Sequence, residues 1–328
     1  MNLEDIFHPF SDLDFEKHAL ALFQHQYEQN KVYHAFCNLL QIDPIRITSI
    51  EKIPFLPISF FKTHQVKTGN FESEIEFHSS GTTGNEISKH FIKDVSFYER
   101  AFLHSFEYFY GNPADYCFLA LLPNYLEQEH SSLIYMMNRL ISGSKYAESG
   151  FYLYNFEDLY KKIITLQEKK IKTILFGVSF ALLDFAAQFT FSAPNLIVFE
   201  TGGMKGRRPE MVKEELHRIL CNALNVKNIH SEYGMCELLS QAYSSGENMF
   251  ATPPWMKLLL RDEKDPLFCS QFLTNGVINI IDFANLHSCA FIATDDLGKR
   301  SQNETIEILG RLDAAQVRGC NLMYADNF

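Results

Sequence analysis

Clustered positive charge is missing from this 328-residue sequence, in which 29 Lys and Arg residues stand against 40 Asp and Glu residues for a net charge of −11. Because contacts with nucleic-acid phosphates require clustered cations, we exclude a nucleic-acid binder. Charged residues make up 21% and hydrophobic residues 46% of the chain, so disorder and a coiled coil are also poor descriptions. The length fits two domains or one large α/β unit.

A long uninterrupted apolar run is missing as well. The most apolar segment, 174–191, contains Asp184 and Gln188 and is split by Gly177, whereas a membrane span needs about 20 apolar residues. The segment therefore predicts a buried strand followed by a helix, and no membrane span. The N-terminal residues lack the basic and apolar regions of a signal peptide, so we expect a cytoplasmic protein.

Paired cysteines are also missing. The seven cysteines are odd in number, and no two are separated by two residues. This pattern indicates reduced thiols rather than a disulfide framework or a zinc knuckle. Six of them lie mostly among apolar residues and are predicted to pack in the interior. The seventh, Cys320, follows Arg318 and Gly319 near the end of the sequence.

The hydrophobic pattern predicts alternating strands and helices. Residues 1–60 are expected to be helical, with Phe15, His18, Ala19, Leu22 and Phe23 on one face. Strands are predicted at 116–122, 173–177, 196–199 and 277–283. Helices are predicted at 97–108, 132–140, 156–169 and 209–220, the last with Pro209 in its first turn. Strands interleaved with helices of this length imply βαβ units and a largely parallel sheet.

A segment rich in Ser, Thr and Gly follows the strand-like run 75–78; it reads Ser79-Ser80-Gly81-Thr82-Thr83-Gly84. Consecutive hydroxyls and glycines let side-chain and backbone donors close around phosphate oxygens. The segment does not match the lysine-containing Walker pattern. On its own it is interpreted equally well as a polar surface loop.

Four further segments follow in order along the chain: Thr201-Gly202-Gly203-Met204, Tyr233-Gly234-Met235-Cys236-Glu237, Thr294-Asp295-Asp296-Leu297-Gly298 and Gly310-Arg311-Leu312-Asp313. With the Ser/Thr/Gly loop, this series resembles the motifs of the acyl-adenylate-forming superfamily. Three longer strings, at 121–127, 200–208 and 318–322, resemble the LuxE family of acyl-protein synthetases.

The resemblance implies an α/β fold like the N-terminal domain of acyl-CoA synthetases, with mainly parallel sheets flanked by helices. The usual C-terminal domain that supplies a catalytic lysine is not expected. We expect an N-terminal helical segment at 1–74 packed on the core, an adenylate-forming core at 75–310, and a C-terminal arm at 311–328 that carries Cys320.

The resemblance also assigns site residues. The loop Ser79, Ser80, Gly81, Thr82, Thr83 and Gly84 would bind the phosphates of ATP, and Gly202, Gly203 and Met204 would line its adenine. Tyr233 and Gly234 would border the base, Asp296 would bind the ribose, Arg311 would face the nucleotide, and Glu237 would bind Mg²⁺. Because the usual lysine is missing, Lys205 and Arg207, with Arg208, are candidates for the catalytic cation, although a solvated basic segment is equally consistent.

The sequence departs from the superfamily at three positions. Lys89 lies five residues after Gly84 instead of the usual three, so its role is open. Cys236 replaces a threonine and Asp295 replaces a glycine, and neither change removes a carboxylate that the motifs require.

The function implied by the resemblance is activation of a fatty acid to acyl-AMP, followed by transfer to Cys320. A LuxC-like acyl reductase would then receive the acyl group, as in bioluminescence-type aldehyde supply, within a possible homo- or hetero-oligomer. Arg318 would favour the Cys320 thiolate, and the ten residues from Gly310 to Cys320 reach about 33 Å when extended.

Three alternatives stay open. An acyl-CoA or aryl-CoA ligase would use free CoA in place of the protein thiol. An α/β-hydrolase-type acyltransferase would use Ser179, which lies in Gly177-Val178-Ser179-Phe180-Ala181 between a predicted strand and helix. A non-catalytic scaffold subunit is the third.

Overall fold

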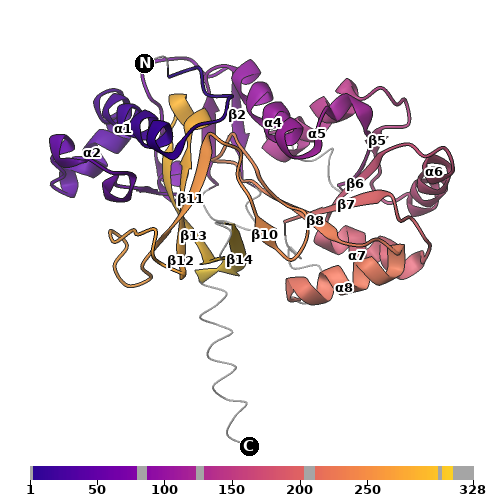
Figure 1. Cartoon of the computed structure of the whole chain (residues 1–328). Helices are drawn as coiled ribbons and strands as arrows, with labels where there is room; N and C mark the ends of the chain where they lie inside the picture. Colours follow the sequence, from indigo (N-terminus) through magenta and orange to yellow (C-terminus); the bar gives the residue numbers. More distant parts are fainter. Residues whose placement is uncertain (1–2, 80–86, 123–128, 203–210, 302–304, 313–328) are drawn as a thin grey trace, which may run out of the picture. The chain divides into compact units, whose positions relative to one another are not determined.

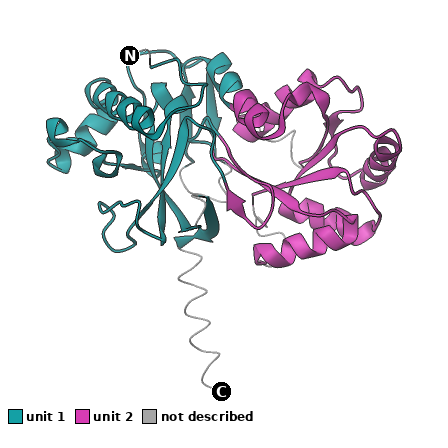
Figure 2. Cartoon of the chain, viewed as in Figure 1, with its two compact units in different colours: residues 1–101, 236–240, 251–328 teal, residues 102–235, 241–250 magenta. Residues whose placement is uncertain are grey.

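A computed structural model describes residues 3–79, 87–122, 129–202, 211–301 and 305–312 (Figure 1). The chain forms two compact units (Figure 2). Unit 1 comprises residues 1–101, 236–240 and 251–328, and unit 2 comprises residues 102–235 and 241–250. The boundary between the two units falls inside helix α4 (Val95–Tyr110), and residues 1–101 belong to the same unit as strands from the far end of the sequence.

Unit 2 contains a largely parallel sheet, as the sequence predicts. Its strand order is β5-β4-β6-β7-β8-β9, and only β9 runs antiparallel to its neighbour. The strands are β4 (Cys117–Leu121), β5 (Gly150–Phe151), β6 (Thr173–Val178), β7 (Leu196–Thr201), β8 (Ile229–Tyr233), β9 (Ala242–Ser244) and, apart from this order, β10 (Met249–Phe250). The helices between them are α5 (Ser132–Gly143), α6 (Phe156–Glu168), α7 (Ser179–Gln188) and α8 (Lys213–Leu224).

The predicted strands and helices of unit 2 are confirmed, with one correction at a helix start. Helix α8 begins at Lys213 after the N-cap Val212, later than the predicted start at residue 209, and Pro209 lies outside the described residues. The apolar segment 174–191 forms β6 and α7, as expected. A Cβ on Gly177 would lie 2.8 Å from the Leu182 side chain, so glycine allows this close approach of strand and helix.

The order of strands places the carboxyl ends of the parallel strands at one edge. The chain passes from β4 out to β5, then back across β4 to β6, β7 and β8. Because such crossovers are right-handed, α5 covers one face of the sheet, and α7 and α8 cover the other (Figure 1). Ligands of open α/β sheets bind outside the carboxyl ends of the strands. Gly202 and Tyr233, predicted nucleotide-binding residues, lie at this edge.

Unit 1 differs from the expectation of a mainly parallel sheet. Its main strands follow the order β14-β13-β12-β11 and pair antiparallel, and β1 lies parallel beside β13. These strands are β1 (Leu56–Pro57), β11 (Met256–Arg261), β12 (Asn275–Asp282), β13 (Phe291–Arg300) and β14 (Ile306–Arg311). The predicted strand at 277–283 is confirmed, but the connections 262–274 and 283–290, which join it to its neighbours, contain no α-helix, and the strands pair antiparallel.

The N-terminal helices of unit 1 pack through the predicted face. All five predicted side chains of α1 (Asp12–Gln29) are buried, and Phe15 stacks on Phe283 with ring centroids 4.4 Å apart. Helices α2 (Lys31–Leu39) and α3 (Phe60–Thr63) follow, and β2 (Ile75–His78) pairs antiparallel with β3 (Lys89–Ile92). Short 3₁₀ turns lie at Pro44–Arg46, Ile50–Lys52, Pro113–Asp115 and Phe283–His287.

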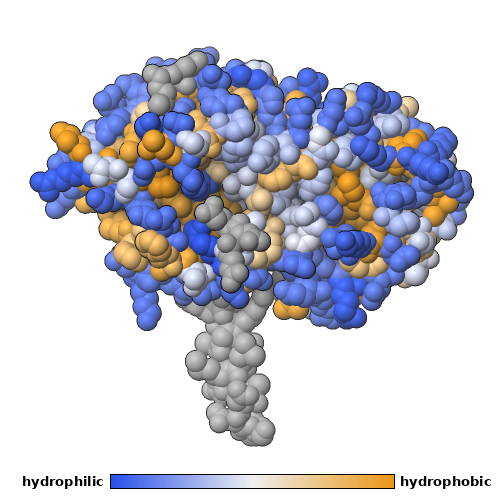
Figure 3. All heavy atoms as spheres, viewed as in Figure 1, coloured by the Kyte–Doolittle hydropathy of each residue, from blue (hydrophilic) through white to orange (hydrophobic). Residues whose placement is uncertain are grey.

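Hydrophilic residues cover most of the face seen in Figure 3, with smaller apolar areas between them. Among the described residues, no helix is both long and apolar enough to cross a membrane.

Candidate functional site

The predicted phosphate loop is carried by the β2–β3 hairpin of unit 1. Backbone N–H of Ser79 donates to the Ser88 carbonyl at 3.1 Å, and Ser88 N–H donates to Ser79 Oγ at 3.0 Å. These two bonds hold the ends of the loop side by side. Ser80, Gly81, Thr82, Thr83 and Gly84 lie outside the described residues.

Glu237 lies beside the base of this loop. Its carboxyl group is buried, and burial raises its pKa, whereas a hydrogen bond with Ser88 and the positive charges of Arg311 and Lys62 oppose that rise. In the parts of the chain that the structure describes, no group of three or more His, Cys, Asp and Glu residues is arranged to hold a metal. Mg²⁺ commonly takes one or two protein carboxylates together with substrate phosphates and water. A lone buried carboxylate next to a phosphate loop fits that donor set.

Buried side chains from three places fix the backbone around Glu237. His90 Nδ1 lies 2.9 Å from the Cys236 carbonyl, and burial lowers the pKa of His90 to about 4, so the ring is neutral and donates this bond. Asn285 Nδ2 donates to the Glu237 carbonyl at 2.7 Å, and Asn285 Oδ1 accepts from Leu239 N–H at 3.1 Å.

Asp282 holds the end of the same segment. It accepts the N–H of Ser240 at 2.9 Å and its hydroxyl at 2.7 Å, and Trp255 Nε1 donates to the Ser240 oxygen at 2.9 Å. We call residues 236–240, together with His90, Asp282 and Asn285, the Glu237 clamp. Its hydrogen bonds leave the Glu237 backbone little freedom, so the carboxyl group is presented from a fixed position.

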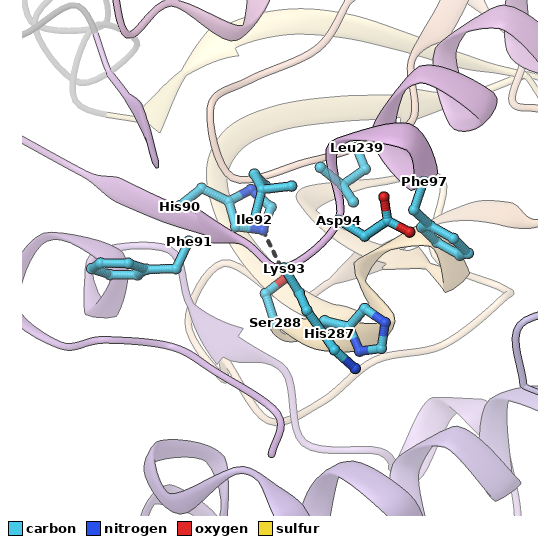
Figure 4. A pocket seen from close by; sticks show the side chains of 9 residues that line it. All are labelled: His90, Phe91, Ile92, Lys93, Asp94, Phe97, Leu239, His287 and Ser288. Atoms are coloured by element: carbon cyan, nitrogen blue, oxygen red, sulfur yellow. Dashed lines mark hydrogen bonds between the residues drawn. The ribbon is translucent and has the colours of Figure 1, made fainter. Parts of the chain in front are cut away.

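A small hollow, with an enclosed volume of about 10 Å³, lies next to the clamp in unit 1 (Figure 4). His90 Nε2 and Ser288 Oγ are 2.8 Å apart in its wall, and Lys93, Asp94 and His287 also line it. Small-molecule sites usually measure about 300–1,000 Å³. The hollow is therefore too small for a nucleotide or a fatty acid.

Asp296 and Arg311 face each other across β13 and β14. They are register partners, and Arg311 Nε lies 3.8 Å from Asp296 Oδ1. The Arg311 side chain is 74% exposed and that of Asp296 only 16% exposed. An exposed cation anchored by a mostly buried carboxylate can reach toward an anionic ligand. Among its described residues, unit 1 thus contains four predicted site residues, Ser79, Glu237, Asp296 and Arg311.

Unit 2 contains the predicted base-binding residues that the structure describes. Gly202 follows β7 with φ of +70°, a conformation that favours glycine. Tyr233 ends β8 and packs edge-on against Phe250, with ring centroids 5.9 Å apart. A side chain at Gly234 would overlap the Glu232 carboxylate, so this glycine has a packing reason as well as its predicted role.

A buried carboxylate that the sequence analysis did not single out lies at the same edge of unit 2. Glu200 is 1% exposed and receives hydrogen bonds from Ser231 Oγ at 2.8 Å, Lys213 Nζ at 2.8 Å and Ser179 Oγ at 3.0 Å. Burial opposes its ionisation, but His217, Lys213 and Ser231 together lower the pKa of Glu200 to about 2. The sequence feature that could have pointed to Glu200 is an acidic residue near the end of the apolar run of β7.

Glu232, on the adjacent strand β8, behaves in the opposite way. It accepts a hydrogen bond from Thr201 Oγ1 at 2.7 Å. Burial, reinforced by the negative charge of Glu200, raises the pKa of Glu232 to about 7. Two neighbouring carboxyl groups therefore differ in charge below neutral pH, with Glu200 ionised and Glu232 protonated.

The geometry does not favour Ser179 as a nucleophile. Its side chain is buried, and its hydroxyl lies 3.0 Å from Glu200 Oε2 and 3.1 Å from the Gly202 carbonyl. Both neighbours are acceptors that compete for the single hydroxyl proton, and no histidine of the described segments forms a hydrogen bond with this hydroxyl. Ser179 therefore fits a structural tie between α7 and the end of β7.

Six of the seven cysteines are described, and five of them are buried. Burial raises the pKa of all six, to about 12 for Cys37 and to about 11 for Cys269. A buried thiol with a raised pKa is a poor nucleophile. The expectation that these six cysteines pack in the interior is confirmed for the five buried ones, while Cys221 is half-buried.

The remaining predicted site residues lie outside the described ranges: Gly203, Met204, Lys205, Arg207 and Cys320. Their assignments stay predictions.

Comparison with known proteins supports the resemblance. Residues 11–107 match the family model described as "Acyl-protein synthetase, LuxE". The long-chain-fatty-acid–luciferin-component ligase of Photorhabdus luminescens is 41% identical over 71 residues, which are 21% of this chain and 60% of that relative.

Solved structures share the fold. MatB from Rhodopseudomonas palustris with bound ATP has a TM-score of 0.53 at 14% identity, over 74% of this chain and 49% of MatB. MenE, the O-succinylbenzoate coenzyme A synthetase of Bacillus subtilis, in complex with ATP and magnesium, has a TM-score of 0.52 at 16% identity, over 72% of this chain and 49% of MenE. The chain thus spans about half the length of these structures, and the predicted adenylate-forming fold is confirmed.

Proposed function

We propose that this chain is a LuxE-type acyl-protein synthetase, which activates a long-chain fatty acid with MgATP and carries the acyl group on Cys320. The observation that carries the proposal is the position of Glu237. It is a buried carboxylate held beside the base of a Ser/Thr/Gly loop, with the charges of Arg311 and Lys62 acting on it.

In the first step, a carboxylate oxygen of the fatty acid attacks the α-phosphorus of ATP. The bond from that phosphorus to the β-phosphate bridging oxygen breaks, which gives acyl-AMP and pyrophosphate. Mg²⁺ bound at Glu237 would neutralise phosphate charge during this transfer. The hydroxyls and backbone N–H groups of the phosphate loop would hold the leaving pyrophosphate, while Arg311 supplies a fixed positive charge and Asp296 accepts hydrogen bonds from the ribose.

In the second step, the Cys320 thiolate attacks the acyl carbon and AMP leaves, so that a thioester forms. Because the six described cysteines have raised pKa values and five are buried, Cys320 is the best candidate nucleophile in the sequence. Lys205 and Arg207 remain the candidates for the cation that supports the adenylation step.

The acyl group would then pass to an acyl reductase that makes the aldehyde. The Photorhabdus relative is named a luciferin-component ligase, which supports a light-emitting pathway as the destination of the acyl group. A CoA ligase, in which free CoA replaces Cys320 as acceptor, is the second candidate function, since the structural neighbour MenE is named a coenzyme A synthetase.

The test is the mass of the intact protein after incubation with MgATP and myristate, followed by peptide mapping. We expect a hydroxylamine-labile myristoyl mass on Cys320, absent without ATP and absent in Cys320→Ser. The matched control Cys221→Ser, which alters the only half-buried cysteine among those described, should still be acylated. Acyl-CoA formation without any protein-bound acyl group would instead favour the CoA ligase.

A further inference from the structure

Four elements of unit 2 converge on the Glu200 carboxylate. Ser179 comes from the start of α7, Ser231 from β8 and Lys213 from the start of α8, while Glu200 itself lies near the end of β7. Lys213 Nζ and Ser231 Oγ both contact Oε1, and Ser179 Oγ contacts Oε2. Burying an ion pair rarely adds net stability by itself, because desolvation offsets the attraction. A charged group at 1% exposure therefore calls for another role.

The hydrogen-bond partners of Glu200 link its carboxylate to Gly202 on one side and to the start of α8 on the other. Ser179 has one hydroxyl proton and two acceptors within reach, Glu200 Oε2 at 3.0 Å and the Gly202 carbonyl at 3.1 Å. Ser179 therefore connects the charge on Glu200 to the backbone of Gly202, where φ is +70°. On the other side, the ion pair fixes Lys213, the first residue of α8, whose ammonium also lies 5.3 Å from the centre of the Phe250 ring.

Gly202 and Lys213 are the two residues that flank segment 203–212. Glu200 thus holds both residues that flank this segment, Gly202 through Ser179 and Lys213 through the ion pair. They lie at the carboxyl edge of the sheet, where ligands of such folds bind. Resting on the proposed function, we propose that Glu200 is a positioning residue for the nucleotide: through Ser179 and Lys213 it fixes the turn at Gly202 that faces the adenine. It acts through these neighbours and does not touch ATP itself.

A positioning role and a merely structural role predict different results in a charge-removal cycle. Glu200→Gln keeps the shape but removes the anionic partner of Lys213. Lys213→Met removes the ammonium group from a buried carboxylate that keeps its hydrogen bonds from Ser179 and Ser231 and the neighbouring His217 ring, 3.8 Å away. Each single variant therefore loses stability. The double variant removes both charges, and Met retains the apolar contact with Phe250. If Glu200 only stabilises unit 2, the double variant recovers ATP affinity together with stability. If it positions Gly202, stability recovers and ATP affinity does not.

The experiment measures the Kd for MgATP by calorimetry, the KM for ATP and kcat in fatty-acid-dependent exchange of pyrophosphate, and the urea midpoint for each variant of the full chain. We expect the double variant to regain the wild-type midpoint but to keep a rise of about tenfold in Kd and in KM for ATP, with kcat changed less. Glu157→Gln, which breaks the exposed 2.9 Å ion pair with Lys161 on α6, is the matched control and should match wild type.

Wild-type ATP affinity in a stable double variant would overturn the inference. If instead the proposed function fails, wild-type protein would bind MgATP but would not exchange pyrophosphate into ATP. The comparison of Kd values between the variants would still decide the role of Glu200. If wild-type protein does not bind MgATP at all, both proposals are refuted.

Discussion

Asn285→Ala tests the Glu237 clamp most sharply, because Asn285 makes three hydrogen bonds inside unit 1 at 0% exposure. Its Nδ2 donates to the carbonyls of Glu237 at 2.7 Å and Cys289 at 3.1 Å, and its Oδ1 accepts Leu239 N–H at 3.1 Å. The substitution leaves the Glu237 and Cys289 carbonyls without this hydrogen-bond donor. Leu239 N–H is not left unpaired, because it keeps a 3.3 Å contact with Asp282. Each buried carbonyl left without a donor costs about 1–3 kcal/mol, so the free energy of unfolding should fall by about 2–6 kcal/mol.

The single tryptophan provides the assay, because Trp255 is buried in unit 1 and donates to Ser240 inside the clamp. Its fluorescence during urea unfolding reports the free energy of unfolding of this unit, and an unchanged slope against urea would show that the change is in stability. The control is Asn38→Ala, whose exposed side chain accepts one hydrogen bond from Tyr27, with an expected change within about 0.5 kcal/mol.

The variant should also need more Mg²⁺ for half-maximal pyrophosphate exchange, because the Glu237 carbonyl is no longer held. A loss of stability below about 1 kcal/mol, with an unchanged Mg²⁺ requirement, would refute the clamp as described.

Three further predictions follow from unit 2 and the cysteines. The pKa of Glu232 is raised from 4.5 to about 7, so between these pH values the folded state holds a proton that the unfolded state has lost. The free energy of unfolding should therefore fall by up to about 3 kcal/mol as pH rises through that window. The urea midpoint of Glu232→Gln should not show this pH-dependent fall, and an equal fall in the variant would contradict the assignment to Glu232. Gly234→Ala should lower the urea midpoint and the ATP affinity together, because its methyl group would overlap the Glu232 carboxylate; wild-type values for both would show that the site relaxes freely. Titration of the native protein with a thiol reagent should modify Cys320 first, and faster labelling of buried Cys289 would contradict the described packing.

Much of the fold is predictable because the signals are local. The apolar runs of β4, β6 and β7 and the apolar face of α1 are read directly from spacing, and a parallel sheet follows from their alternation with helices. The antiparallel sheet of unit 1 is harder, since β1 pairs with β13 more than 230 residues later, as in Leu56 with Ile292. No local pattern specifies such a pairing.

The candidate site shows the same division. Motif positions such as Glu237 and Gly202 are visible in the sequence because they sit in short strings of unusual composition. Glu200 lies in the string 200–208, but the sequence alone assigns it no role, because its hydrogen-bond partners Ser179, Ser231 and Lys213 come from three other elements. The Asn285 and His90 contacts with residues 236–237 are likewise created by tertiary packing alone.

Fatty-acid-dependent exchange of labelled pyrophosphate into ATP is the most direct test of the central claim, that this chain forms acyl-AMP. We predict exchange that requires Mg²⁺ and a long-chain fatty acid and that persists in Cys320→Ser, because adenylation precedes acyl transfer to the thiol. In Glu237→Gln the exchange rate should fall at least about a hundredfold. A folded wild-type protein that binds MgATP but shows no acid-dependent exchange at any chain length would contradict it.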